Sequence, residues 1–162
     1  MKKILFLLAA VLLQTSVCFA ELPAVSLKDI NGKTVNTAKL SNDGKPYIIS
    51  FFATWCKPCL RELDAIHEVY PDWQDETGVR LIAVSIDEAQ NASKVKPLAD
   101  SKNWEYEVLL DVNGDFKRAM GVAMVPTVFV IDGDNNIVET RSSYTDGSEA
   151  HLLEVVKKIL AK

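Results

Sequence analysis

The segment Trp55-Cys56-Lys57-Pro58-Cys59 constrains the fold of this chain more than any other part of the sequence. Residues 47–53, which precede it by one residue, are mostly apolar, which is the pattern of a buried strand. Residues 60–73, directly after it, carry apolar side chains at helical spacing. We therefore expect the two cysteines where a strand ends and a helix begins. Cysteines at this spacing can close a small disulfide and open it again with little backbone movement.

The start of a helix favours one chemical form of the first cysteine. Unpaired backbone N–H groups and the positive end of the helix dipole stabilise an anion there. In this chain the anion would be the thiolate of Cys56, and the thiolate is the reactive form of cysteine. The neighbouring Lys57 adds a positive charge, which should lower the pKa of the thiol further.

The first twenty residues have the pattern of a secretory signal peptide. Lys2 and Lys3 precede an unbroken apolar run over residues 4–13, and Cys18-Phe19-Ala20 places small residues where cleavage after Ala20 requires them. The apolar run is short for a membrane span. Two alternatives stay open, a lipoprotein acylated at Cys18 and an uncleaved membrane anchor. Because the pattern favours a cleaved signal peptide, we expect the protein to be periplasmic or secreted.

Removal of the signal peptide leaves one domain, residues 21–162, which is long enough for a proper core. It carries 16 basic and 22 acidic residues, a net charge of −6 (16 − 22), which argues against a nucleic-acid partner. Only Cys56 and Cys59 remain, an even pair that suits a disulfide in an exported protein. A bridge across so short a loop stabilises a fold poorly, so its purpose should be chemical.

The rest of the sequence predicts alternating strands and helices. Asn31-Gly32 is a strong hairpin signal, and Gly78 should end the first helix. The order predicts one α/β sandwich, in which helices cover both faces of a central mixed sheet. The expected strands are a hairpin within 25–35, then 47–53, 79–86, 106–110, 127–132 and 136–141; the expected helices are 58–76, 91–102 with Ser93 as a possible cap, 115–120 and 148–160.

A second motif makes a resemblance specific. Val125-Pro126-Thr127 leads into an apolar strand, and Pro126 lies 67 residues after Cys59 (126 − 59). A strand running into a CxxC motif, followed by this proline loop, resembles the thioredoxin fold. The helix and strand inserted at 87–110, the N-terminal hairpin and the signal peptide resemble the TlpA/ResA group of exported thiol-disulfide oxidoreductases. The resemblance covers nearly all of residues 25–162.

The resemblance implies roles for the residues of both motifs. Cys56, with its sulfur toward solvent, would attack a disulfide of a protein partner, and Cys59 would resolve the mixed disulfide. Pro126 should be cis, and the backbone of Val125 should pair with an extended segment of the partner. Trp55 should shape the partner groove, although a purely structural aromatic residue fits the pattern equally well.

A carboxylate on the first helix is the remaining candidate for the chemistry. Glu62 follows Cys59 by three residues, and a glutamate at this place in the TlpA/ResA group assists proton transfer near the buried cysteine. Thioredoxins carry an aspartate six residues before the first cysteine, and this chain has Ser50 there. Since a serine cannot act as a carboxylate base, Glu62 or water would have to deprotonate Cys59. His67 and His151 are predicted to lie on helices, as surface or edge residues rather than catalysts.

The sequence leaves several other roles open for the cysteine pair. A static disulfide and half of a zinc site are possible, but zinc usually needs four ligands. A peroxidase of the peroxiredoxin class would want a threonine where Ala53 stands. A copper-handling or binding module would want a histidine near the proline loop, and none lies there. We expect a cofactor-free, monomeric reductant of protein disulfides that receives electrons from an unidentified membrane or periplasmic donor.

Overall fold

The structure is a computed structural model that describes residues 22–162. The predicted signal peptide, its cleavage site at Ala20 and the alternative lipidation site at Cys18 lie outside the described residues. Within 22–162, none of the helices combines the length and the apolar composition that a bilayer crossing requires.

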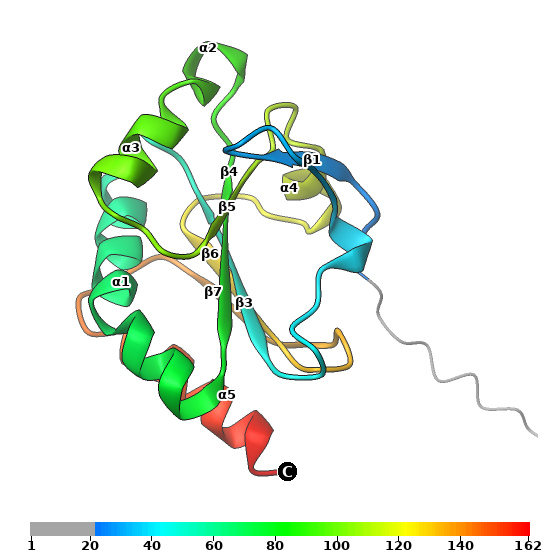
Figure 1. Cartoon of the computed structure of the whole chain (residues 1–162), viewed down its shortest axis with the longest axis vertical. Coiled ribbons are helices and arrows are strands. Elements are labelled where there is room, and N and C mark those ends of the chain that lie inside the picture. The colour runs from blue at the N-terminus through cyan, green and yellow to red at the C-terminus, as the bar shows by residue number, and fades with distance from the viewer. Residues whose placement is uncertain (1–21) are drawn as a thin grey trace, which may run out of the picture.

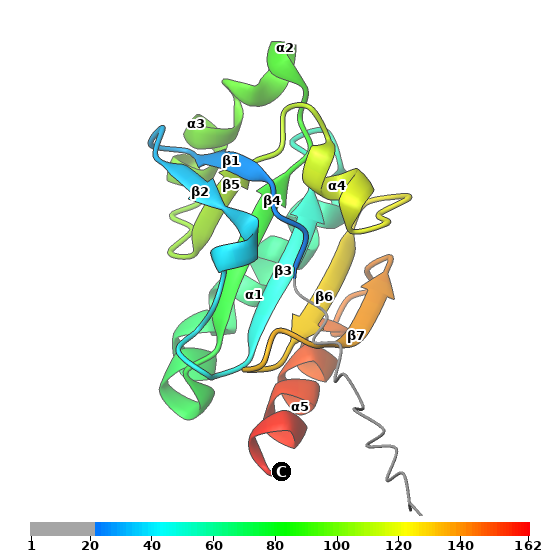
Figure 2. The same ribbon diagram turned by 90° about the vertical axis from the view of Figure 1, so that its right-hand side faces the viewer.

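A seven-stranded mixed sheet runs through the molecule (Figures 1 and 2). Its strand order is β2-β1-β5-β4-β3-β6-β7. The three central strands β3, β4 and β5 are parallel, and every other pairing is antiparallel. The strands are β1 (Ser26–Asp29), β2 (Thr34–Asn36), β3 (Tyr47–Phe52), β4 (Arg80–Ser85), β5 (Glu107–Leu110), β6 (Thr127–Ile131) and β7 (Ile137–Ser142).

Helices cover both faces of the sheet, as predicted. Figure 1 shows α1 and α3 on one side and α4 on the other, and the two hydrophobic clusters divide in the same way. Ile48 and Phe52 of β3 belong to the cluster under α1, whereas Tyr47 and Phe51 belong to the cluster under α4. The alternation follows from the two-residue period of a strand. The helices are α1 (Lys57–Thr77), α2 (Ala89–Ala92), α3 (Val95–Ser101), α4 (Asp115–Ala119) and α5 (Glu149–Leu160), with a 3-10 turn η1 (Thr37–Lys39).

Both ends of α1 are fixed by residues that the sequence singled out. Cys56 is the N-cap, and its sulfur accepts a hydrogen bond from the backbone N–H of Cys59 at 3.3 Å. Pro58 lies in the first turn, where a missing N–H leaves no hydrogen bond unmade. Gly78 ends the helix in the left-handed conformation, with a φ of 68°. The first helix is therefore confirmed, and it runs without interruption through Pro71.

The predicted helix 91–102 is wrong in detail, because two short helices, α2 and α3, occupy this segment. Pro97 favours this break. It has no N–H to donate to a carbonyl four residues earlier, so it costs least in the first turn of a helix, and α3 begins two residues before it. Ser93 is the C-cap of α2 and makes no N-terminal cap.

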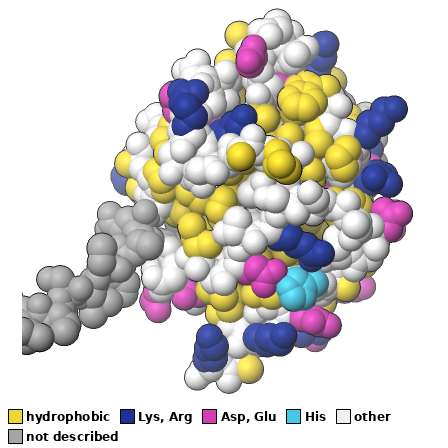
Figure 3. Space-filling view, turned by 180° about the vertical axis from the view of Figure 1, so that it is seen from behind, with side chains coloured by type: hydrophobic (Ala, Val, Ile, Leu, Met, Phe, Trp, Pro, Cys, Tyr) yellow, Lys and Arg dark blue, Asp and Glu magenta, His cyan; other side chains and the backbone are white. Residues whose placement is uncertain are grey.

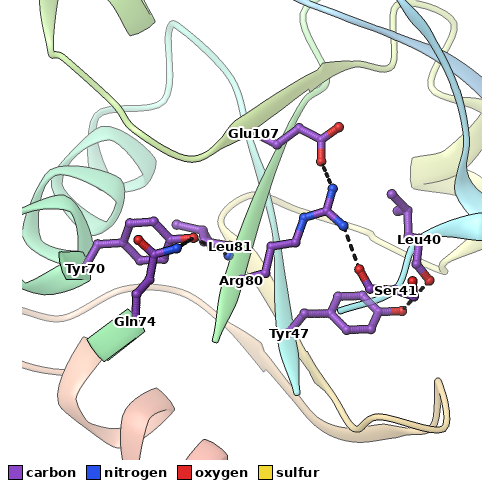
Figure 4. Close-up of polar contacts among 8 residues, drawn as sticks. All are labelled: Leu40, Ser41, Tyr47, Tyr70, Gln74, Arg80, Leu81 and Glu107. Carbon is purple, nitrogen blue, oxygen red and sulfur yellow. Dashed lines mark hydrogen bonds and ion pairs between the residues drawn. The ribbon is translucent and has the colours of Figure 1, made fainter. Parts of the chain in front are cut away.

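The end of the sheet opposite the cysteines is held by polar contacts (Figure 4). Arg80, at the start of β4, donates to the carbonyl of Ser41 at 2.6 Å and forms an ion pair with Glu107 of β5. The hydroxyl of Tyr70 on α1 accepts from the backbone N–H of Leu81 at 3.0 Å. These contacts connect α1, the loop at Ser41 and the strands β4 and β5 at this end of the sheet. The cysteine motif lies at the opposite end, after β3.

The segment 132–136, between the predicted strands 127–132 and 136–141, is the turn of an antiparallel hairpin. Oδ1 of Asp132 accepts hydrogen bonds from the backbone N–H groups of Asp134, at 3.0 Å, and Asn136, at 2.9 Å. The carboxylate is therefore occupied by donors of its own loop. A bulge between Val130 and Ile131 shifts the register where β6 pairs with β7.

Candidate active site

The two cysteines form a disulfide at the start of α1. Cys59 is completely buried, and Cys56 is only 6% exposed. We expected the sulfur of Cys56 to face solvent, but in the oxidised protein Cys56 is almost completely buried. Cys56 packs in the same apolar cluster as Cys59, Ala53 and Leu63, and this packing covers most of it. Cys56 is still the only one of the two with any exposed area, so a partner would reach it first.

The turn that leads into the motif is fixed by a buried carboxylate, which the sequence analysis missed. Asp87 is 1% exposed and accepts from the backbone N–H of Thr54 at 2.8 Å and from its hydroxyl at 2.6 Å. It also accepts from the hydroxyl of Ser85 at 2.8 Å. Because β3 and β4 are parallel neighbours, residues that follow them meet at one edge of the sheet. The contact between Asp87 and Thr54 depends on the pairing of β3 with β4. The sequence alone does not give this pairing.

The proline loop lies at the same edge. The antiparallel register pairs Phe51 with Thr127, which brings the start of β6 beside the end of β3. The peptide bond between Val125 and Pro126 is cis, so this prediction is confirmed. Val125 is half-buried and packs against the cluster that contains both cysteines. The two sequence motifs are thus brought together at one end of the sheet.

Trp55 lies on the surface beside the disulfide. It is 63% exposed, and Met124, just before the proline loop, is 57% exposed. Figure 3 shows apolar side chains gathered in the upper half of the molecule, toward the end that carries α2 in Figure 1. Trp55 also lines an open groove of about 800 Å³. The other residues along this groove are Ile86, Glu88, Ala89, Gln90, Asn91, Val112, Asn113, Gly114, Lys117 and Arg118.

Glu62 is a buried carboxyl group, which is unusual for a charged residue on an amphipathic helix. It is 3% exposed, and its Oε2 accepts a hydrogen bond from the hydroxyl of Ser50 at 3.3 Å. Burial raises the pKa of Glu62 to about 7, because the charged form loses its hydration. Ser50, predicted only as a replacement for an aspartate, is therefore a direct partner of Glu62. A carboxyl that titrates near neutral pH can take up and release a proton under physiological conditions.

The two histidines lie on helices, as predicted. His67, on α1, is half-buried, and its buried Nδ1 has no hydrogen-bond partner among residues 22–162. His151, on α5, is exposed and contacts Glu139 at 2.8 Å. In the described part of the chain, no three His, Cys, Asp or Glu side chains are grouped in a way that could hold a metal ion.

Comparison with known proteins agrees with the fold and the cysteine pair. Residues 19–140 match the AhpC/TSA family. The chain is 32% identical over 139 residues to the thiol-disulfide oxidoreductase ResA of Bacillus thuringiensis subsp. konkukian, which covers 86% of this chain and 76% of that protein. A second ResA, from Bacillus subtilis, is 28% identical over 132 residues, covering 82% of this chain and 71% of that one.

Solved structures give the same picture. A thioredoxin-like protein from Porphyromonas gingivalis is 69% identical and superimposes with a TM-score of 0.78, over 88% of this chain and 93% of that one. StoA from Bacillus subtilis, at 22% identity, shares the fold with a TM-score of 0.65, over 82% of this chain and 96% of that one. The chain therefore belongs to the AhpC/TSA family, and it is a thiol-disulfide oxidoreductase of the thioredoxin fold.

Proposed function

We propose that the protein is an exported reductant of protein disulfides, with Cys56 as the nucleophile and Cys59 as the resolving thiol. The observation that carries the proposal is the Cys56–Cys59 bridge at the N-terminus of α1, with the buried carboxyl of Glu62 three residues beyond Cys59. A nucleophile, a resolving group and a proton acceptor thus lie within the first two turns of one helix.

The first step is attack on the partner. The Cys56 thiolate forms a bond to one sulfur of a partner disulfide, and the partner's other sulfur leaves as a thiolate. The positive end of α1 favours the attacking anion. The backbone of Val125 and the exposed Trp55 support this step, because they could hold an extended partner segment beside Cys56. The product is a mixed disulfide between Cys56 and the partner.

The second step releases the partner. Cys59 loses its proton to the carboxylate of Glu62 and attacks the sulfur of Cys56. The bond between Cys56 and the partner breaks, the partner leaves as a thiolate, and the Cys56–Cys59 bridge forms. Two electrons have passed from the protein to the partner. A pKa of about 7 for Glu62 supports this role, since a buried thiol needs an acceptor that is ionised near neutral pH.

The location and the assembly state complete the proposal. We infer that cleavage after Ala20 releases a monomer, residues 21–162, into the periplasm or the medium, where a membrane or periplasmic dithiol donor restores the reduced form. The pattern of residues 1–20 supports export. Edman sequencing of the protein from the periplasmic fraction tests this, with Glu21 expected at the N-terminus. Full-length protein in the cytoplasmic fraction would contradict it.

The Cys59→Ser variant tests the assignment of the two thiols. Without the resolving sulfur, the mixed disulfide on Cys56 should persist and be recovered on a non-reducing gel with a partner attached. The matched control is Cys56→Ser, which should trap nothing, because Cys59 is completely buried. Trapping by Cys56→Ser, and none by Cys59→Ser, would reverse the roles. The partners caught on Cys56 also identify the substrates.

A further inference from the structure

The register of the sheet places a charged residue on the face where Glu62 is buried. Ser50 of β3 is paired with Val128 of β6, and Val128 is paired with Arg141 of β7. Paired residues of neighbouring strands project to the same face of a sheet. Since Ser50 donates to Glu62 on the α1 side, Arg141 projects to that side as well. Residues of three neighbouring strands thus lie in one row on the face of the sheet that Glu62 of α1 contacts.

Arg141 is anchored at the start of α5. Its Nη1 donates to the carbonyl of Ser148 at 2.9 Å, one residue before α5 begins. The first residue of α5 is Glu149, and its Oε2 accepts from the hydroxyl of Tyr144 at 3.0 Å. The ring of Tyr144 is buried, while Arg141 and Glu149 are half-buried. A cation and an anion are therefore both held in place at the seam between β7 and α5.

These two charges act on Glu62 in opposite directions. The positive charge of Arg141 lowers the pKa of Glu62 and the negative charge of Glu149 raises it, after the larger effect of burial. Arg61, next to Glu62 on α1, is exposed and forms an ion pair with Asp146 at 3.6 Å, so solvent screens both. Within the described residues, Ser50 of β3, Arg141 of β7 and Glu149 of α5 are thus the polar and charged groups that act on the carboxyl of Glu62.

We propose that Arg141 and Glu149 are positioning residues that set the proton affinity of Glu62, so that the seam between β7 and α5 tunes the release of the partner. The proposal rests on the proposed role of Glu62 and extends it to two residues that lie on other elements. Neither residue touches the reacting sulfur atoms in this scheme. Each acts only through its charge on the carboxyl group.

Direct titration of the Glu62 carboxyl tests the proposal without any assay of activity. The ¹³C carboxyl signal of Glu62 is followed by NMR against pH in the oxidised protein. Arg141→Gln should move the midpoint up by about half a pH unit or more, and Glu149→Gln should move it down by a similar amount. Arg141→Lys keeps the charge and should stay close to the wild-type midpoint. These opposite directions are not expected from a loss of packing alone.

Control variants and a second measurement distinguish a failure of this inference from a failure of the proposed role of Glu62. Glu154→Gln and Lys158→Gln each remove one exposed charge from α5 and should leave the midpoint in place. Midpoints for Arg141→Gln and Glu149→Gln that match these controls would overturn the inference. The rate of partner release from a mixed disulfide, measured against pH, should shift in the same directions. A wild-type release profile that Glu62→Gln leaves unchanged would instead contradict the proposed role of Glu62, whatever the NMR titrations give.

Discussion

At the scale of the residue, the site contains two buried carboxyl groups with different roles. Glu62 and Asp87 are both almost fully buried, yet their surroundings differ. Asp87 accepts three hydrogen bonds from Thr54 and Ser85, which satisfy its charge. Glu62 accepts one from Ser50, so its charged form remains costly. The carboxylate of Asp87 therefore holds the turn before the cysteine motif, and the carboxyl of Glu62 is free to exchange a proton.

The cost of burying Glu62 should be visible in the stability of the protein. Its pKa is about 7 in the fold against an ordinary value of 4.5. The fold favours the protonated form, so the contribution of Glu62 is fully present below about pH 4.5 and is lost as the pH rises through about 7. The difference corresponds to about 3 kcal/mol. Glu62→Gln should therefore raise the free energy of unfolding at pH 8 and change it little at pH 4.5.

Urea unfolding of the oxidised protein at the two pH values measures this effect. The matched control is Glu68→Gln, an exposed site on the same helix, where no comparable change is expected. If the wild type and Glu62→Gln lose stability in parallel between pH 4.5 and pH 8, Glu62 does not carry the raised pKa that the mechanism needs.

At the scale of the element, local sequence signals were sufficient where the chain itself supplies the cause. The strand before Cys56, the helix after it and the end of that helix at Gly78 follow from apolar spacing and from backbone preferences. Pro97 is equally visible in the sequence, and its place in the first turn of α3 favours two short helices over one continuous helix 91–102. The contacts of Asp87 and Arg141 could not be predicted, because they depend on which strands pair and in which register.

The end of α1 gives a test at this scale. Gly78 has a φ of 68°, and an added Cβ would lie 2.7 Å from Nζ of Lys45, whose side chain can move away. Gly78→Ala should lower the free energy of unfolding by about 1 kcal/mol, because a left-handed conformation is unfavourable for alanine. Gly78→Asn should cost less, since asparagine tolerates this conformation better. Equal losses in the two variants, measured by urea unfolding, would show that backbone conformation is not the cause.

At the scale of the whole molecule, the fold should not depend on the disulfide. A bridge between residues three apart in sequence restricts the unfolded chain by about 2 kcal/mol. The two hydrophobic clusters hold the sheet between its helices without it. The reduced protein should therefore remain folded and unfold cooperatively.

The difference in stability between the oxidised and the reduced protein also indicates the direction of electron flow. A reductant has a disulfide that is favoured over its dithiol, and an oxidant has the reverse. We expect the oxidised protein to be more stable than the reduced one by about 2 kcal/mol in urea unfolding, with and without a reducing agent. The control is the Cys56→Ser, Cys59→Ser double variant, whose stability should not respond to that agent. A reduced protein that is more stable than the oxidised one would contradict the proposed reducing direction.

The central claim is that Cys56 is ionised near neutral pH and reacts first. It is tested most directly by the rate at which Cys56 is alkylated by iodoacetamide, measured against pH in the reduced Cys59→Ser variant. The account predicts a half-maximal rate at about pH 7 or below, because the start of α1 and Lys57 favour the thiolate. A half-maximal rate at about pH 8.5, as for free cysteine, would contradict it.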